Sequence, residues 1–154
     1  MGRDSACPEL VEREPADSTL AIAYGFLGTI LWHKNMPAQA FEASEKANAL
    51  EAIFSQQEMA DMRRAYEVSG YSGFLLKENE LRQQHLAEGK YESPLMIALT
   101  YAVAGANSEA LDWLEKAVEE RTPWLPELKM DPAWDALRSQ PRFIALLKKI
   151  GLEK

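Results

Sequence analysis

Apolar residues recur every three or four positions along most of the chain, and polar residues fill the positions between them. In the first such stretch, this spacing gathers one set on a single helical face: Leu20, Ala23, Tyr24, Leu27 and Leu31. Because an α-helix turns once in about 3.6 residues, the pattern predicts amphipathic helices. The sequence shows no sustained alternation of the kind that is typical of β-strands. We therefore expect an all-α fold.

Residues that favour helix starts divide this pattern into six helices. The expected starts are Ser18, Pro37, Ser55, Ser72, Ser93 and Asn107 or Ser108. The clearest is Ser55 with Glu58 three residues later, because this spacing forms a capping box in which both side chains satisfy free backbone amides. Pro37 suits the first turn of a helix, where its missing amide is harmless.

Three residues that favour helix ends lie 35 positions apart: Asn35, Gly70 and Gly105. Asparagine and glycine tolerate the left-handed backbone that ends one helix and lets the chain reverse into the next. A repeat of about 20–50 residues is typical of stacked helical hairpins. The spacing therefore predicts about three hairpins over residues 18–122.

The pattern changes after the third hairpin. Pro123, Pro126 and Pro132 lie close together and exclude a long helix there. We expect two short helices instead, over residues 132–138 and 141–150. The chain thus divides into three parts: a flexible lead (1–17), helical repeats (18–122) and capping helices (123–154).

The repeats resemble those of the tetratricopeptide repeat (TPR) family, whose helical hairpins recur about every 34 residues. The first hairpin matches the family pattern at Tyr24, Leu27, Gly28, Leu31, Ala40 and Ala47, and the third at Ile97, Ala98, Tyr101, Gly105, Ala110, Leu114 and Ala117. The second hairpin departs from it, because Arg63, Leu75 and Arg82 stand where small residues are usual. The resemblance implies a TPR-like α-solenoid of about three hairpins with a short helical cap.

The C-terminal part carries a second resemblance. Its sequences Trp113-Leu114-Glu115, Asp131-Pro132 and Pro141-Arg142-Phe143 are similar to the end of repeat regions in bacterial and archaeal signalling proteins, including adenylate-cyclase-like and winged-helix regulators. Those proteins usually have aspartate where this chain has Gln140. The resemblance implies a regulatory or docking module.

In TPR proteins, partners usually lie in the concave groove lined by the first helix of each hairpin. By the 35-residue period, the corresponding positions here are Ile22, Gly25, Thr29, Trp32, Gln57, Ala60, Arg64, Glu67, Leu95, Leu99 and Ala102. The set is mostly apolar and lacks the array of Lys and Asn residues that clamps a C-terminal carboxylate. The resemblance therefore implies a helix or an extended apolar peptide as the partner. Alternatively, Trp32 and Leu99 only support the stack.

Composition narrows the range of partners. The chain has 154 residues, 47% of them hydrophobic, which suffices for one domain with a continuous core. Its net charge of −7 argues against nucleic acid and against an anionic membrane surface, both of which favour clustered Lys and Arg. The only cysteine is Cys7, so an intramolecular disulfide is excluded and a cytoplasmic location is expected. A homodimer through the first hairpin is a further possibility.

Residue patterns that carry catalysis or bind metals are sparse. The sequence has neither a Gly-rich phosphate loop nor a Gly-x-Ser-x-Gly motif. His85 and Glu88 form a single two-ligand pair, too few for a metal site. We therefore predict no catalytic residue, metal or cofactor. A small enzyme is the alternative, but no nucleophile–base pair is visible in the sequence.

A cluster of aromatic and basic residues around the proline-rich turn allows another function. Its members are Trp113, Trp124, Trp134, Arg138 and Arg142. The tryptophans are expected to seal the end of the stack, and the arginines to pair with Asp131 or Asp135. Alternatively, all members but Trp113 would form a site for a small acidic ligand, which guanidinium groups can bind bidentately. The protein would then be a regulatory sensor.

Overall fold

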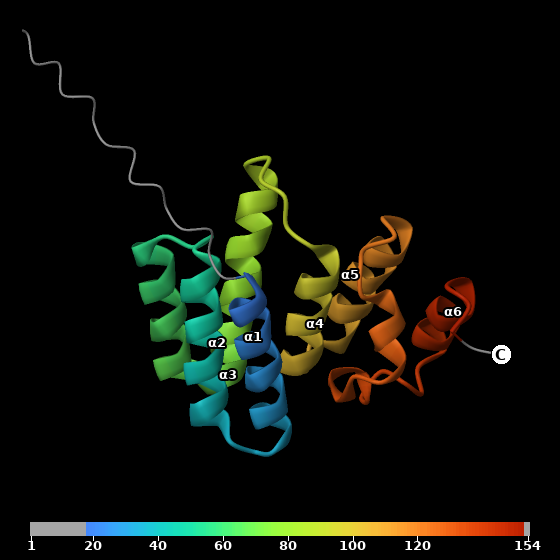
Figure 1. The fold of residues 1–154 in the computed structure, drawn as a ribbon, viewed down its shortest axis with the longest axis horizontal. Helices are drawn as coiled ribbons and strands as arrows, with labels where there is room; N and C mark the ends of the chain where they lie inside the picture. The colour runs from blue at the N-terminus through green and yellow to red at the C-terminus, as the bar shows by residue number, and fades with distance from the viewer. Residues whose placement is uncertain (1–17, 153–154) are drawn as a thin grey trace, which may run out of the picture.

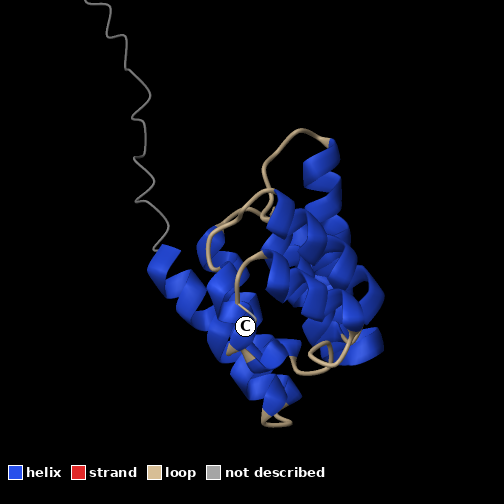
Figure 2. Ribbon diagram, turned by 90° about the vertical axis from the view of Figure 1, so that its right-hand side faces the viewer, coloured by secondary structure: helices blue, strands red, loops and turns tan. Residues whose placement is uncertain are grey.

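The computed structural model describes residues 18–152, and within this range the secondary structure consists of helices and loops, with no strand (Figures 1 and 2). The elements are α1 (Ser18–His33), α2 (Pro37–Glu51), α3 (Gln56–Ala87), α4 (Pro94–Ala104), α5 (Asn107–Glu119), the 3-10 helices η1 (Leu125–Lys129) and η2 (Pro132–Trp134), and α6 (Pro141–Lys149). The expected all-α fold is thus confirmed for these residues. The expected flexible lead, with Cys7, lies outside them.

Local capping chemistry determines where α3 begins but not where α5 begins. The predicted capping box is present, because Ser55 Oγ accepts from the Glu58 amide at 3.2 Å and the Ser55 amide donates to Glu58 Oε2 at 2.6 Å. The helix α5 begins at Asn107, one of the two expected starts, but neither Asn107 nor Ser108 is its N-cap: Ala106 takes that position and makes no side-chain bond. The Ala106 amide instead donates to the Tyr101 carbonyl at 2.9 Å, so the turn that ends α4 leads directly into α5.

The three expected turn residues adopt positive φ angles. Asn35 has a φ of 57° and Gly105 a φ of 83°, and both lie between consecutive helices. Gly70, with φ 66° and ψ −159°, instead forms a kink inside the continuous helix α3. This backbone conformation is accessible almost only to glycine. Gly70 therefore divides α3 into a first half (56–69) and a second half (71–87) that run in different directions.

Each α-helix packs against the next helix along the chain, from α1 through α6. The 3-10 helix η2 also packs against α1 and α4. Along the longest axis of the molecule, the first half of α3 lies at one end and α6 at the other (Figure 1). The helix η2 of the C-terminal segment thus contacts α1, although these two elements are far apart in the sequence.

The core consists of two clusters that meet at α4. One cluster contains Leu111, Leu114, Leu137 and Phe143 among its members and joins α4, α5 and the C-terminal segment. The other joins α2, α3 and α4 around Phe74 and other residues. Leu99 of α4 packs against both clusters, so α4 connects the two ends of the molecule.

The buried face of α1 differs from the predicted one. Leu20 and Leu27 are 42% and 41% exposed, whereas Ala21 and Gly28 are buried. A Cβ atom at Gly28 would lie 2.6 Å from Ser44 Oγ, so α1 and α2 approach each other more closely than large side chains would allow. Close packing through small residues therefore leaves large apolar side chains of α1 exposed.

The C-terminal segment contains one helix more than expected. The helix η1 was not predicted, although Pro126 suits its first turn. The helix that begins at Pro132 ends at Trp134, four residues earlier than expected. The helix from Pro141 is confirmed, and Gly151 follows its end with a φ of 77°.

Candidate functional site

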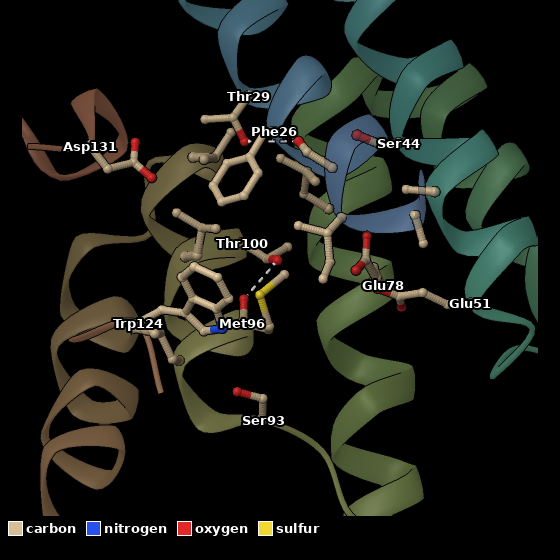
Figure 3. A pocket seen from close by; sticks show the side chains of 18 of the residues that line it. Phe26, Thr29, Ser44, Glu51, Glu78, Ser93, Met96, Thr100, Trp124 and Asp131 are labelled. Atoms are coloured by element: carbon tan, nitrogen blue, oxygen red, sulfur yellow. Dashed lines mark hydrogen bonds between the residues drawn. The ribbon is translucent and has the colours of Figure 1, made fainter. Parts of the chain in front are cut away.

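A pocket of about 400 Å³ lies between α1, α2, the second half of α3, α4 and the η1–η2 segment (Figure 3). We call it the central pocket. Ligand sites in proteins typically enclose about 300–1,000 Å³ and are mostly apolar. The apolar side chains that line the central pocket include Ile22, Phe26, Leu75, Leu95, Met96, Leu99, Val103, Trp124, Leu128 and Trp134. Its size and lining therefore fall in the range that is typical of ligand sites.

Helical spacing explains why α1 contributes to this pocket. Ile22, Phe26 and Thr29 are four and three positions apart, so they share a face that lies next to the buried face of the helix. Ile22 is 47% and Phe26 40% exposed, although both are large and apolar. From the opposite side α4 contributes Met96, which is 39% exposed. Side chains from two separate helices thus present apolar surface to one cavity.

Trp124 stands at the edge of the central pocket in an unusual backbone conformation. Its φ angle is 72°, a left-handed value that is rare for a bulky residue, and its side chain is 60% exposed. The preceding turn is anchored by Thr122, whose hydroxyl donates to the Ala117 carbonyl at 3.0 Å. Such strained residues persist where the surrounding structure imposes them, and they are common at ligand-binding sites. Figure 3 shows Trp124 on the side of the pocket opposite Glu51 and Glu78.

A guanidinium group with three carboxylate partners lies at the polar wall of the pocket. Arg82 donates from Nε to Glu78 at 3.1 Å, from Nη1 to Glu92 at 2.7 Å and from Nη2 to Glu51 at 3.2 Å. Burial alone would lower the pKa of Arg82, but the charges of Glu78, Glu51 and Glu92 raise it above its usual value. Arg82 therefore stays positively charged in this setting.

A buried histidine extends this group of charges. The Nδ1 atom of His85 lies 3.1 Å from Glu92, and its Nε2 atom lies 2.8 Å from Glu58. Burial raises the pKa of Glu58, but bonds from the Ser55 amide and hydroxyl and from His85 outweigh it and hold that pKa below its usual value. Together Glu51, Glu58, Glu78, Arg82, His85 and Glu92 form what we call the charge network.

The structure brings together only part of the predicted groove. The residues from the first and third hairpins that line the central pocket are Ile22, Gly25, Thr29, Leu95 and Leu99. Trp32 packs instead against Tyr71 in the core, with 5.2 Å between ring centroids. The role of these predicted groove residues in binding a partner stays a prediction.

The expected contribution of the second hairpin comes from a different segment. Gln57, Arg64 and Glu67 lie on the first half of α3, are exposed and do not line the central pocket. Arg64 pairs there with Asp61 at 3.3 Å. The kink at Gly70 is the physical reason, because it directs the second half of α3 toward the pocket in place of the first.

The arginines of the alternative ligand site are bonded within the chain. Arg138 donates to Asp135 at 2.6 Å, as one of the expected pairings, and also to the backbone carbonyls of residues 128, 129 and 131. Arg142 pairs with Asp112 at 2.7 Å and with Glu115 at 3.0 Å, not with Asp131 or Asp135.

The two tryptophans of that alternative site differ in exposure, although both line the central pocket. Trp134 is 2% exposed and stacks near Phe143, with 6.3 Å between ring centroids, as expected of a seal. Trp124 is not buried with it. Arg138 and Arg142 lie outside the lining of that pocket, so the structure does not bring the four residues together there.

Several contributors to the central pocket were not predicted from the sequence, among them Phe26 of α1, Met96 of α4, Glu51 of α2 and the second half of α3. One signal for the first was available. From Ser18 to Trp32 the chain has no charged residue, which is more apolar surface than a helix with one buried face requires. No comparable local signal marks the second half of α3, because its position depends on the direction taken at Gly70.

Two further features of residues 18–152 bear on function. No group of three or more His, Cys, Asp or Glu side chains in this range is placed to hold a metal ion. No helix in the same range combines the length and hydropathy needed to cross a bilayer.

No family model matches the chain, and neither a curated protein nor a solved structure is significantly similar to it. The central pocket and the adjoining charge network are thus the features from which a function can be inferred.

Proposed function

We propose that the protein is a non-catalytic, TPR-like scaffold that binds an apolar segment of another protein in the central pocket. The observation that carries the proposal is the convergence of large, partly exposed apolar side chains from three elements on one cavity, namely Ile22, Phe26, Met96 and Trp124. Fully burying an exposed side chain of this kind contributes about 1.5–3 kcal/mol, and these side chains are 39–60% exposed, so covering each contributes about half of that. A few anchors therefore suffice for specific binding.

The TPR-like part of the proposal rests on packing order and on turn geometry. Each α-helix packs on the next along the chain. The positive φ angles at Asn35, Gly70 and Gly105 recur at intervals of 35 residues. Both features support stacked hairpins, whose concave surfaces commonly bind peptides.

A protein segment fits the pocket better than the small acidic ligand considered above. Arg138 and Arg142 already bind carboxylates of the chain itself. The central pocket, by contrast, contains several carboxylates, which would repel an acid. An amphipathic helix can place residues from successive turns on one side and insert them into such a pocket.

The proposal can be tested with a display library of random peptides of about 16 residues, or about four helical turns. Peptides selected on the full-length protein are measured by Trp fluorescence or calorimetry against Ile22→Gln and Met96→Gln. These variants are neutral, so they alter the apolar lining without altering charge. We expect binding to weaken by about tenfold or more in each.

The matched control is Val68→Gln, because Val68 is 85% exposed and lies on the first half of α3, away from the pocket. Circular dichroism checks that all variants keep their helicity. Failure to select any peptide, or equal binding to Ile22→Gln and wild type, would contradict the proposal.

A further inference from the structure

We propose that the segment bound in the central pocket carries a basic residue, whose cation docks against Glu51. This inference rests on the proposed function and specifies the chemistry of the partner. It follows from the charges around the pocket, from the inability of the chain's own cations to neutralise them, and from the position of Glu51 opposite the apolar side.

The charged residues that line the central pocket are predominantly acidic. Of the described residues in its lining, Glu51, Glu78, Glu127 and Asp131 carry carboxylates, whereas Arg82 is the one cation. A cavity with low-dielectric walls concentrates the field of such charges and attracts ions of the opposite sign. The lining therefore selects against acidic partners and for basic ones.

The chain's own cations do not neutralise these carboxylates. Arg82 is shared among Glu51, Glu78 and Glu92, all within 3.2 Å of its nitrogens. His85 can add at most one further positive charge, and it faces Glu58 as well as Glu92. In the charge network, four carboxylates thus face at most two cations. Excess negative charge in a buried setting is stabilised by a third cation, which a partner could supply.

Glu51 is the member of the network that a partner can reach. Its side chain is 29% exposed, whereas those of Glu78 and Glu92 are 8% and 6% exposed. Glu51 is also the last residue of α2 and belongs to the lining of the pocket. Figure 3 shows Glu51 and Glu78 across the pocket from Met96 and Trp124. A segment whose apolar side chains contact Met96 and Trp124 can therefore direct a Lys or Arg toward Glu51.

The chain's own N-terminal residues fit this chemistry poorly as an alternative occupant. Residues 1–17 contain five Asp or Glu residues and two Arg residues. Their net negative charge would meet the negative lining of the pocket, which is unfavourable. The observations favour a basic segment of another protein.

The test uses the sequences of the selected peptides and two charge-neutralising changes. We expect Lys or Arg to be enriched at a fixed distance from the apolar anchors. Changing that residue to Gln in the peptide, or Glu51→Gln in the protein, should each weaken binding about tenfold, and the two together little more than either alone. The control is Glu42→Gln, which removes the same charge from an exposed position of α2 outside the pocket lining.

The peptide change keeps the test valid even if Glu51→Gln lowers stability, because it leaves the protein intact. Selected peptides that depend on Ile22 but show no basic enrichment, and no effect of Glu51→Gln, would overturn this inference and leave the proposed function standing. Peptides that are insensitive to Ile22→Gln would overturn both. Tighter binding of a synthetic peptide of residues 1–17 than of the basic peptides would also overturn the inference.

Discussion

The hydroxyl oxygens of Ser44 and Tyr71 lie 2.7 Å apart at a buried point between α2 and the second half of α3. Gly28 of α1 faces this pair, because a Cβ atom there would lie 2.6 Å from Ser44 Oγ and 3.4 Å from the Tyr71 hydroxyl. Burial raises the pKa of Tyr71 to about 12, against the opposing effect of its bond to Ser44, so the phenol stays neutral. The helices α1, α2 and α3 thus pack together at the hydrogen bond between Ser44 and Tyr71. This packing positions α1 beside the central pocket.

Gly28→Ala should lower the free energy of unfolding by about 1–3 kcal/mol, a typical cost of overpacking a closely packed site. The added methyl group would displace Ser44 Oγ and would also press on the Ala40 carbonyl oxygen, which is 3.3 Å from the Cβ position. Urea unfolding measures the effect.

Gly25→Ala is the matched control for this substitution. Gly25 lies on the same helix, but nothing is found within 4 Å of its Cβ position. There we expect alanine to stabilise the protein by about 0.5–1 kcal/mol, because it restricts the unfolded chain and favours the helix. Equal effects of the two substitutions would show that Gly28 is not a close-contact point.

Arg82→Met should destabilise the protein by about 3–5 kcal/mol, because it leaves buried carboxylates without their shared cation. The comparison is Arg63→Met, since Arg63 pairs with Glu45 at the surface and its side chain is 59% exposed. An exposed pair of this kind contributes about 1 kcal/mol or less. Thermal or chemical unfolding of both variants checks the difference. Similar losses in the two would mean that the charge network is not buried as described.

Glu58 should make stability dependent on pH in the acid range. Its pKa in the folded protein lies below the usual 4.5, so the contribution of its ionised form is complete above pH 4.5. As the pH falls through the folded pKa, the carboxylate takes up a proton and the contribution is lost. Unfolding curves of wild type and Glu58→Gln at several pH values should therefore converge below pH 4.5. A difference that is independent of pH would contradict this reading.

Trp124→Gly and Trp124→Ala distinguish the contribution of the Trp124 ring to binding from the cost of its backbone conformation to stability. Both should weaken binding of selected peptides by about 2 kcal/mol or more, as removal of a tryptophan that anchors an interface commonly does. The glycine variant should be more stable than the alanine variant by about 1 kcal/mol, because only glycine adopts a φ of 72° without cost. Peptide titrations of the two variants measure the loss of binding free energy, and unfolding curves measure the difference in their stability. Tight binding without the ring would remove Trp124 from the site.

Features encoded by a few neighbouring residues could be predicted from the sequence. The capping box of Ser55 and Glu58 and the reversals at Asn35 and Gly105 depend on local backbone chemistry, and they lie where the residues indicate. The face that α1 buries could not be predicted in this way. It depends on the contact of Gly28 with Ser44, which joins residues from different helices.

The central pocket could be predicted only in part, for the same reason. Ile22 and Leu99 follow from the repeat period, but the period does not specify the direction that α3 takes after Gly70. The left-handed conformation of Trp124 is also imposed from outside its own sequence, because tryptophan has no preference for it. Long-range packing thus decides which side chains surround the cavity.

The most direct test of binding in the central pocket is a methyl NMR titration of the full-length protein with the tightest selected peptide. We predict chemical shift changes at the methyl groups of Ile22, Leu95, Met96 and Leu99, which line the pocket. Leu27 and Leu76, which are 41% and 44% exposed and lie outside the lining, should change little. Changes at these two residues without changes in the pocket would contradict the proposed binding site.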